Sequence, residues 1–596
     1  MLAGGFSIAW VANIAGPEKT AVRVIRGILI FTTGIKLNNY RGIVSMRQIA
    51  VIDSETDPFL HGRIPQPFLW GFWDGEHYKE FADAIDLIAF LYDKAIIVYA
   101  HNGGKFDYHF LLDYIDPYTE ITIINGRIAK FKIGECEFRD SYNIIPTSLS
   151  TFKKDEIDYQ IFEHNKRNIP ENWKKIKDYL MMDCKYLYEY VMAFIDRFGM
   201  NLTQAGTAMK VWQKISGREA PNDRYGINYK LFSPYYYGGR CQAFEFGLIQ
   251  GPLKMVDIRS AYPYAMLSKH PISLDYQEVK IHDIYDLAEA DRGPSLHQVV
   301  CVAHGCFPFR GDDGSLYFPN DDVERLYYVT GWELLAAYDT GTVERAFYHK
   351  SFVFEETIDF SEYILHFFEE RKQAKARGDK AGDIFSKLLM NSLYGKFGSC
   401  PDEYRNYMIV EPSIFDEHGQ IGSDDGGEPW DFGGEFGPWA LAERPLSEDE
   451  QRFYNVATAA SITGYVRAYL WRAICLCGGV AYCDTDSIVA RDVSALRIGD
   501  NLGDWSLDDE FSDGAIAGRK LYAFKSDLSG YHKIASKGVR LSAEQIYKIA
   551  QGATVTYEPM APVFSVHKGP HFLSRRVKMT EKYLQEKPCV KSNKVA

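Results

Sequence analysis

The sequence of 596 residues lacks the features that would direct it to a membrane or to an oxidising compartment. It contains no apolar run of 18 or more residues, so no membrane-spanning helix is expected. The opening MLAGGFSIAWVANIAG has no basic start of the kind found in secretory signals. Its ten cysteines form no C-x-x-C pair, which argues against a zinc ribbon or a disulfide framework and favours a reducing compartment.

A net positive charge is also missing. The formal net charge is −13, whereas proteins that bind nucleic acids neutralise phosphates with Lys and Arg. The acidic residues gather in 424–450, however, and residues 567–596 carry eight Lys and Arg against two Glu. The overall charge therefore does not exclude a polyanionic partner, because a basic C-terminal segment can contact a duplex.

Length and composition indicate a multi-domain globular protein, with 46% hydrophobic and 25% charged residues. The first 195 residues alternate strand-like and helical patterns, which predicts an α/β domain. From about residue 200 the aromatic content rises, and long helical patterns cover 361–379 and 380–397. There is no internal repeat, and the Gly/Asp/Glu-rich stretch near 421–437 is predicted to be a loop.

Residues 1–45 are unusual because Glu18 is their one acidic residue and they precede a strong strand prediction, IAVIDSE. Three interpretations stay open for this segment. It is a transit-like extension, an over-called start upstream of Met46, or a small extra pair of strands.

The apolar stretch AYCDTDSIVA at 481–490 holds two aspartates, Asp484 and Asp486. We expect a short β-hairpin through Gly478 and Gly479, with Asp484 and Asp486 near the turn and with both carboxylates on one face, as on a strand. Like charges in a half-buried place repel unless a cation or a proton separates them. A single D-x-D is also typical of a solvated turn, so further carboxylates are needed to support a cation site.

A third carboxylate and two basic helical faces supply that support. Asp257 ends a strand-like run in KMVDIRSAYPYAM, and three carboxylates from two strands can hold two Mg²⁺ for phosphoryl transfer. Downstream, polar residues recur at helical spacing and predict a surface suited to a triphosphate. They are Arg371 and Lys375, then Lys387, Asn391 and Tyr394.

The motifs DIRSAYP, KLLMNSLYGKFG and YCDTDS, in this order, resemble motifs A, B and C of family B DNA polymerases. The resemblance implies a right-hand polymerase domain with palm, fingers and thumb. It also implies that Asp257 and Asp486 hold metal, that Asp484 is their neighbour, and that Tyr262 lies under the sugar of the incoming nucleotide. Ala261 stands where the family usually has leucine.

Three patterns before residue 195 resemble the exonuclease motifs of the same family and imply an RNase H-like 3′-5′ exonuclease domain. The resemblance implies four metal-holding carboxylates, a tyrosine that orients the attacking water, and an asparagine in contact with DNA. These residues are Asp53 and Glu55 in VIDSETD, Asn102 and Asp107 in HNGGKFD, and Tyr179 and Asp183, four apart in a helical pattern.

Shorter matches imply further contacts with DNA. Ser141 would contact the single-stranded 3′ end, although Tyr142 replaces the usual leucine, and Lys154 would assist the exonuclease phosphate. Tyr236, Gly238 and Gly239 belong to YYGG, a motif that links exonuclease to palm. Thr463 and Arg467 belong to a T-x2-A-R motif in which Val466 replaces alanine. Lys520 and Tyr522 belong to a K-x-Y motif that steadies the primer end.

Motif spacing narrows the subgroup. About 120 residues separate motif A from motif B and nearly 90 separate B from C, as in the protein-primed family B polymerases of phages and linear plasmids, which carry two insertions. Expected partners are template-primer DNA, dNTPs, a terminal protein and a single-stranded DNA-binding protein, with Mg²⁺ or Mn²⁺ as cofactor. The alternatives are a primer-independent polymerase and a catalytically silent DNA-binding scaffold.

We therefore predict an α+β multi-domain enzyme that works as a monomer in the cytoplasm of a bacterial host, or in an organelle matrix if the N-terminal segment is a transit peptide. The predicted boundaries are an extension at 1–45, the exonuclease domain at 46–195 and the polymerase domain at 196–596. Within the latter we expect palm at 196–266 and 451–525, a first insertion at 267–355, fingers at 356–398, a second insertion at 399–450 and thumb at 526–596.

Overall fold

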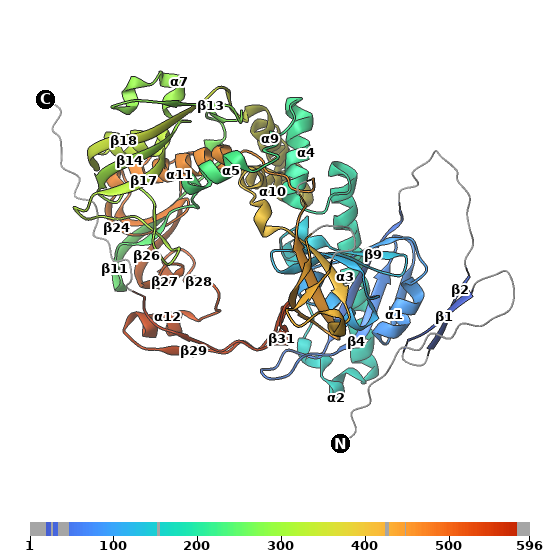
Figure 1. The fold of residues 1–596 in the computed structure, drawn as a ribbon. Helices are drawn as coiled ribbons and strands as arrows, with labels where there is room; N and C mark the ends of the chain where they lie inside the picture. Colours follow the sequence, from blue (N-terminus) through green and yellow to red (C-terminus); the bar gives the residue numbers. More distant parts are fainter. Residues whose placement is uncertain are drawn as a thin grey trace.

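The computed structural model describes residues 20–25, 28–33, 47–151, 155–422, 428–447 and 449–580. Two large sheets organise the chain, one in the N-terminal lobe and one in the lobe that follows it, and the C-terminal segment runs between the lobes (Figure 1). Each sheet has its own apolar core. The predicted α+β multi-domain fold class is thus confirmed, and the predicted domain boundaries stay predictions.

The N-terminal lobe is built on a mixed sheet in which β3 pairs in parallel with β6, and β6 with β9. Its strands are β3 (Ile49–Thr56), β4 (Pro67–Trp73), β5 (Tyr78–Phe81), β6 (Ile97–Ala100), β7 (Glu120–Ile124), β8 (Arg127–Ile133) and β9 (Cys136–Asp140). The helix α3 (Pro170–Phe198) packs on β3 and β4 through a continuous apolar stripe, while α1 (Ala84–Leu91) precedes β6.

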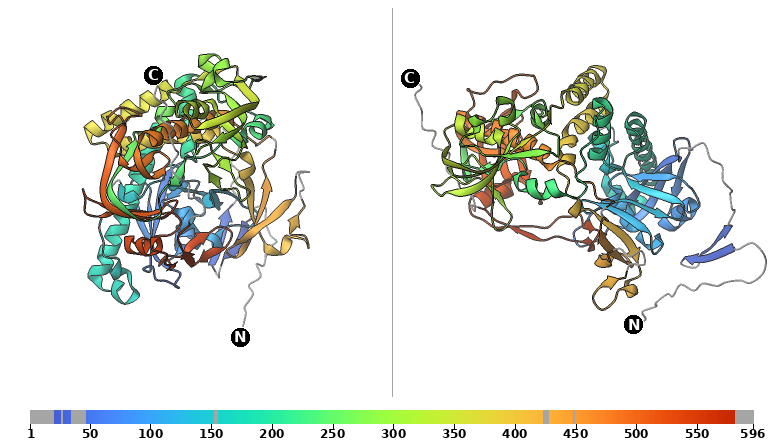
Figure 2. Two further views of the ribbon diagram at one scale, coloured as in Figure 1. Left: turned by 90° about the vertical axis from the view of Figure 1, so that its left-hand side faces the viewer. Right: turned by 45° about the horizontal axis from the view of Figure 1, so that its top comes forward.

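The second insertion continues this sheet. Strand β20 pairs with β7 through Tyr407 and Ile121, which extends the sheet to eleven strands among the described residues. The added strands are β20 (Arg405–Val410), β21 (Gln420–Ile421), β22 (Trp430–Phe436) and β23 (Trp439–Pro445). The loop prediction for 421–437 is wrong for its second half, because residues 430–436 pair along β23 as an edge hairpin despite their glycines (Figure 2).

The second lobe is centred on a seven-stranded antiparallel sheet in the order β10-β24-β25-β11-β26-β27-β28. Its strands are β10 (Cys241–Ala243), β11 (Gly247–Ile258), β24 (Gly478–Asp484), β25 (Ser487–Asp492), β26 (Trp505–Gly518), β27 (Leu521–Ser526) and β28 (His532–Ser536). The largely buried helix α11 (Val456–Leu476) belongs to the same core. Because β28 completes this sheet, the sheet extends past residue 525, where we placed the end of the palm.

The remaining parts surround this sheet. In the first insertion four strands pair in the order β13-β18-β14-β17, and α8 packs on α11. The fingers are two adjacent helices, as predicted, and α4 packs on the second of them. The bounds are α4 (Gln204–Ser216), β13 (Tyr276–Val279), β14 (Leu296–Ala303), β17 (Arg325–Thr330), α8 (Gly331–Asp339), β18 (Val343–Phe354), α9 (Ser361–Arg377) and α10 (Lys380–Phe397).

Several short elements complete the described part of the chain. Among them β1 pairs with β2, which agrees with the interpretation of the N-terminal segment as a small pair of strands. None of the helices in the described ranges is long and apolar enough to cross a membrane. The short elements are β1 (Thr20–Ile25), β2 (Ile28–Thr33), α2 (His164–Arg167), α5 (Ile227–Phe232), α6 (Ala261–Ala265), β12 (His270–Pro271), α7 (Glu289–Arg292), β15 (Phe309–Arg310), β16 (Leu316–Tyr317), β19 (Thr357–Ile358), α12 (Ala543–Ala550), β29 (Val555–Tyr557), β30 (Val563–Ser565), β31 (Gly569–His571) and β32 (Arg575–Val577).

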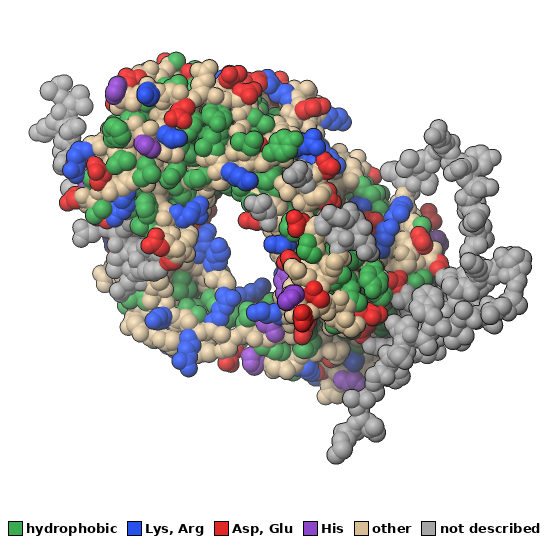
Figure 3. Space-filling model, in the orientation of Figure 1, with side chains coloured by type: hydrophobic (Ala, Val, Ile, Leu, Met, Phe, Trp, Pro, Cys, Tyr) green, Lys and Arg blue, Asp and Glu red, His purple; other side chains and the backbone are tan. Residues whose placement is uncertain are grey.

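The C-terminal segment returns to the N-terminal lobe and closes a ring. Phe564, 4% exposed, packs edge-on against Phe106 with ring centroids 5.1 Å apart. His567 is hydrogen-bonded through Nδ1 to the carbonyl of Gly433 in the second insertion, at 2.7 Å. Figure 3 shows the resulting opening through the molecule, with many Lys and Arg side chains around it.

Candidate active sites

Two carboxylates of the second lobe lie side by side at the end of β11. Asp257 is the register partner of Ser487, and the amide of Ile258 donates to the carbonyl of Asp486 at 2.8 Å. Burial raises the pKa of Asp257 to about 7, with repulsion from Asp486 and Asp508 adding to it. Burial and repulsion from Asp484 raise the pKa of Asp486 to about 6. The pair thus carries excess negative charge that a cation would relieve.

The third carboxylate plays a different part. Lys520 Nζ donates to Asp484 Oδ1 at 2.8 Å, so a lysine already partners this acid. The expected hairpin runs through Gly478 and Gly479 and turns at Thr485 and Asp486, near both carboxylates as predicted, but the two acids do not share one strand, because β24 ends at Asp484. Thr485 adopts φ +61°, which reverses the chain there and removes the strand alternation that was expected to align the two carboxylates.

The predicted nucleotide surface comes together at the fingers. Tyr262 and Tyr394 stack face to face, with centroids 4.2 Å apart and planes 4° apart. Lys387 lies close enough to Asp257 to lower its pKa. Lys387 and Lys375 are exposed, whereas Arg371 Nε is 2.7 Å from Asp383 Oδ1 in an ion pair.

Asn391 and Asp508 extend this surface. The side-chain amide of Asn391 donates to the carbonyl of Lys387 at 2.8 Å, one helical turn earlier. Sequence reasoning missed Asp508 and its ion-pair partner Lys533 on β28, both of which act on the pKa of Asp257. No motif marks them, because only the pairing of β11 with β26 and the packing of β28 bring them there.

The YYGG motif packs against the aspartate hairpin. A side chain at Gly239 would lie 2.7 Å from Thr485, so this close approach requires glycine, whereas Gly238 is exposed. Arg467 supports the backbone of the motif: its Nη1 donates to the carbonyls of Tyr237 at 2.7 Å and Gly238 at 3.1 Å.

Two residues predicted to contact DNA are inside the protein. Arg467 and Thr463 are each 2% exposed, and Arg467 Nε is 2.7 Å from Oε1 of the equally buried Glu333. Their positions suit support of the YYGG backbone, and a direct DNA contact by them stays a prediction. Tyr522, 8% exposed, packs on Tyr482 at 4.8 Å next to the Lys520–Asp484 pair.

A separate cavity of about 260 Å³ lies in the N-terminal lobe. Its walls include the four predicted carboxylates, together with Tyr179 and Asn102. The thiol of Cys184, buried behind the cavity, has its pKa raised by burial and then by the charges of all four acids, which shows how closely they gather. The four are Asp53, Glu55, Asp107 and Asp183.

The fold assembles this cavity from distant segments. The hydroxyl of Ser54 donates to Asp107 Oδ1 at 2.5 Å, and burial raises the pKa of Asp107 to about 6. Tyr159, which sequence reasoning missed although it lies close to Lys154, has its hydroxyl 3.0 Å from that of Tyr179. Phe106, which also lines the cavity, carries the contact with the C-terminal segment.

Three further predicted residues of this lobe differ in their surroundings. Asn102 lines the cavity at φ +63° and accepts a hydrogen bond from Arg127 Nη1 at 2.7 Å. Ser141 is fully buried and hydrogen-bonded to His101 at 3.0 Å, so it supports the wall of the cavity. Lys154 lies outside the described residues.

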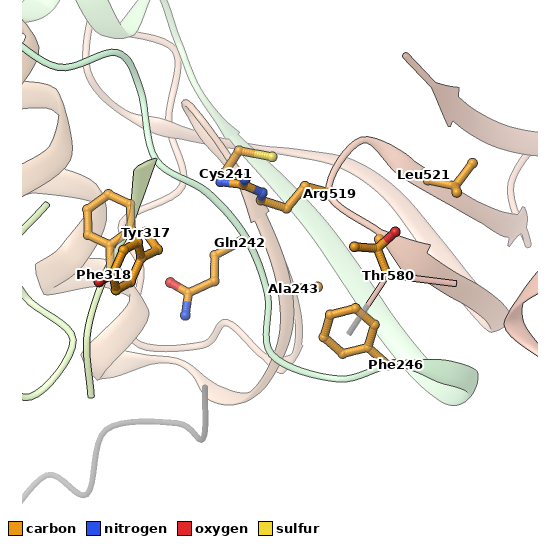
Figure 4. Close-up of a pocket in the computed structure, with 10 residues that line it drawn as sticks. Cys241, Gln242, Ala243, Phe246, Tyr317, Phe318, Arg519, Leu521 and Thr580 are labelled. Carbon is orange, nitrogen blue, oxygen red and sulfur yellow. The ribbon is translucent and has the colours of Figure 1, made fainter. Parts of the chain in front are cut away.

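The donor chemistry of both sites fits a hard divalent cation, which prefers carboxylate oxygens and completes its shell with phosphate and water. Within the described part of the chain, no group of three or more Asp, Glu, His or Cys side chains is already arranged as a complete set of metal ligands. Another cavity, of about 190 Å³, lies beside the edge strand β10 and is lined by Cys241, Gln242 and Arg519 among others (Figure 4). None of the predicted carboxylates lines it, although Cys241 is the register partner of Asp484.

Comparisons with known proteins agree with this architecture. Residues 151–424 match the family described as DNA polymerase type B, organellar and viral. The DNA-directed DNA polymerase of Enterobacteria phage PRD1 is 35% identical over 572 residues, covering 89% of this chain and 98% of that protein. A probable DNA polymerase of Agaricus bitorquis is 23% identical over 80% of this chain and 71% of its own length.

Solved structures of Phi29 DNA polymerase share the fold. Its complex with primer-template DNA has a TM-score of 0.68 at 17% identity, and the ternary complex with incoming nucleotides has 0.66 at 16%. Each match covers 90% of this chain and all of the other. The chain belongs to the family B DNA polymerases. Within that family it is a DNA-directed DNA polymerase of the phage type, which confirms the resemblance read from motifs A, B and C.

Proposed function

We propose that this DNA polymerase also proofreads with a 3′-5′ exonuclease, starts chains on a terminal protein and displaces the strand ahead of it. The observation that carries the proposal is the second carboxylate cavity, which gathers four acids and a tyrosine in a lobe separate from the polymerase acids. An arrangement of this kind suits hydrolysis of a phosphodiester.

At the polymerase site, Asp257 and Asp486 would hold Mg²⁺ or Mn²⁺. The cations would neutralise the triphosphate and assist the attacking and leaving oxygens. The chain's own residues bind and orient the substrates. Lys387 faces the triphosphate, Tyr262 supports the deoxyribose, and Lys520 fixes Asp484 beside the primer end.

At the exonuclease site the four carboxylates would hold the same kind of cation, which activates water and stabilises the leaving oxygen. Tyr179 would orient the attacking water through its hydroxyl, which Tyr159 already steadies at 3.0 Å. Ser54 would keep the Asp107 carboxylate in one orientation.

Separate substitutions test the two sites. We expect Asp486→Asn to abolish primer extension and leave 3′ trimming intact, because the two sets of acids lie in different lobes. Asp53→Ala combined with Asp183→Ala is expected to do the reverse. If either variant, shown by thermal melting to be folded, loses both activities, the assignment of two sites is wrong.

The ring supports the proposal of strand displacement. The second insertion continues the exonuclease sheet, and the C-terminal segment touches both, so DNA inside the ring would be enclosed. Residues 526–580 carry eight Lys and Arg against three Asp and Glu, a charge that suits a duplex. A narrow passage that admits one strand would separate the duplex ahead of the enzyme.

The strand pairing offers a clean deletion in the second insertion. Val410 and Ala440 are register partners, so a two-residue turn can replace residues 412–438. We expect this variant to fill short gaps but to stall at a duplex. Retained trimming of single strands would show an intact exonuclease domain, and unchanged displacement would contradict the role of the insertion.

Protein priming is proposed from the same family relationship. A terminal protein must present a Ser, Thr or Tyr hydroxyl near Asp257 and Asp486, and the first insertion is the added surface beside the palm. The enzyme would work as a monomer in the cytoplasm of a bacterial host, together with a single-stranded DNA-binding protein.

The deciding experiment incubates the enzyme with labelled dNTP, a divalent cation and the protein encoded beside its gene. A covalent protein–nucleotide adduct supports the proposal. If no adduct forms although oligonucleotide primers are extended, protein priming fails. Synthesis on a template without any primer would favour the primer-independent alternative.

A further inference from the structure

Arg240 comes directly after the YYGG motif and is buried, with an exposed fraction of 1%. We infer that Arg240 is a positioning residue for the polymerase acids: it anchors the tight turn between Asp484 and Asp486 to the first insertion and to α11. The inference goes beyond the proposed function but rests on its metal site at Asp257 and Asp486. Because Arg240 is buried, it acts through the protein backbone and not by contact with a substrate.

The guanidinium of Arg240 is held without an opposite charge, since its contacts within the described ranges include no carboxylate. Its Nη1 donates to the carbonyl of Gly305 at 2.8 Å, and its Nε donates to Gln242 Oε1 at 3.0 Å. The ring centroids of Phe318 and Trp471 lie 4.1 and 4.3 Å from its Cζ atom. A buried cation is costly for the folded state unless such contacts compensate it, so they fix the guanidinium in one orientation.

These contacts come from separate parts of the chain. Gly305 and Phe318 lie in the first insertion, whereas Trp471 lies on α11. The indole nitrogen of Trp471 in turn donates to the hydroxyls of Thr340 and Thr342 at 3.2 and 3.1 Å, again in the first insertion. The side chain of Arg240 is therefore fastened to the place where the first insertion packs on the palm.

The backbone of Arg240 contacts the aspartate turn. Its carbonyl accepts from the amide of Thr485 at 2.6 Å, and the next residue, Cys241, is the register partner of Asp484. Thr485 is β-branched and adopts φ +61°, a strained conformation that persists only where the surrounding structure holds it. The hydrogen bond to Arg240 is one such restraint on the turn that places Asp484 and Asp486.

Repulsion between the carboxylates gives the direction of the expected effect. Asp486 lies beside Asp257 and Asp484, so like charges act on a turn that is free to move. A fixed turn keeps the carboxylate oxygens where a cation can bind. Loss of Arg240 is therefore expected to weaken cation binding and to leave the affinity for DNA unchanged.

Hydrogen exchange of the metal-free enzyme tests the positioning directly. Arg240→Met removes the hydrogen bonds of the guanidinium and leaves a long apolar side chain in its place. We expect the peptide 481–490, which contains the Thr485 amide, to exchange about 2- to 10-fold faster than in the wild type, the range for loss of one hydrogen bond. Peptides from β3 and α3 in the other lobe are expected to exchange at the wild-type rate.

Primer extension as a function of Mg²⁺ concentration gives the second measurement. For Arg240→Met we expect the half-saturating Mg²⁺ concentration to rise about 10- to 100-fold, as for other groups that orient metal ligands. The dissociation constant for template-primer DNA is expected to stay at the wild-type value. Arg240→Lys keeps the charge but not the planar fork, so it is expected to give an intermediate value.

Two variants in the first insertion complete the set. Phe318→Leu removes one of the rings on Arg240 and is expected to change both measurements in the same direction, by less. The matched control is Arg325→Met, because Arg325 lies in the same insertion but is paired with Asp321 at 2.5 Å. This control is expected to match the wild type in both measurements.

The outcomes separate positioning from a purely structural role. The inference is overturned if Arg240→Met, shown by thermal melting to be folded, has wild-type exchange in 481–490 and a wild-type half-saturating Mg²⁺ concentration. If Arg240→Met does not fold, Arg240→Lys and Phe318→Leu decide by the same two measurements. Unchanged extension by Asp486→Asn would instead remove the proposed metal site, and the exchange result for Arg240 would still show whether it holds the turn.

Discussion

Phe564→Ala tests whether the ring holds the enzyme on DNA. Phe564 is 4% exposed, and its ring contacts Phe106, His109 and Phe110 at centroid distances of 5.1, 5.2 and 5.5 Å. A buried Phe→Ala change costs ~3–5 kcal/mol when the site cannot collapse. Phe564 joins two surfaces that water can cover when the ring opens, so the open state does not lose this whole free energy. We therefore assign ~2–3 kcal/mol of the cost to the free energy of ring closure.

That loss corresponds to a roughly 30- to 150-fold rise in the ratio of open to closed rings. We expect product length on a primed single-stranded circle, measured after one binding event in the presence of a heparin trap, to fall accordingly. The background for this assay is Asp53→Ala with Asp183→Ala, which the proposed exonuclease assignment expects to be free of trimming. Tyr531→Ala is the control, because Tyr531 is 79% exposed in the turn between β27 and β28, away from this contact.

The refuting result is specific. If folded Phe564→Ala makes products as long as those of the control and dissociates from primed circles at the same rate, closure of the ring by this contact does not retain DNA. The Phe564 contact would then support only the wall of the exonuclease cavity, through Phe106.

Three further predictions concern the polymerase lobe. Tyr262→Val is expected to incorporate ribonucleotides well above wild type in a primer-extension assay, because a smaller side chain leaves room for a 2′-hydroxyl. The pKa values are raised to about 7 for Asp257 and about 6 for Asp486, so primer extension at limiting Mg²⁺ is expected to fall as the pH drops from 7 to 6. Saturating Mg²⁺ is expected to shift the midpoint of this fall to lower pH, because the cation and the proton compete for the same carboxylates. An unchanged midpoint would contradict this. Glu333→Gln would leave Arg467 buried without its carboxylate and lower the stability of the folded state by ~3–5 kcal/mol. Thermal melting measures that loss, and no change in the melting midpoint would show that the ion pair is dispensable.

The family relationship itself was predictable from local sequence. The order of DIRSAYP, KLLMNSLYGKFG and YCDTDS predicts the polymerase acids, since a phosphoryl-transfer site needs those residue types at those positions. The helices of the fingers were equally predictable, because capping and apolar spacing are local: Asp379 caps α10 by accepting from the amide of Gly382. The four acids proposed for the exonuclease were predicted from their motifs for the same reason, and the structure gathers them around one cavity.

Strand pairing and the burial of charged side chains could not be predicted from the local sequence in the same way. The turn at Thr485 depends on a positive φ that strand alternation does not reveal, and Arg467 is charged in sequence yet buried against Glu333, a residue 134 positions away. The junction of β20 with β7 joins an insertion to a sheet formed nearly 300 residues earlier.

The sequence by itself therefore determined the family, and it predicted which carboxylates and which tyrosines carry the chemistry. Only the tertiary structure decided the geometry of the sheet extension and the closed ring. The physical reason is that motifs encode groups that act within a few residues of each other, whereas strand pairing and cavities arise from contacts between distant segments, each of which has many other possible partners.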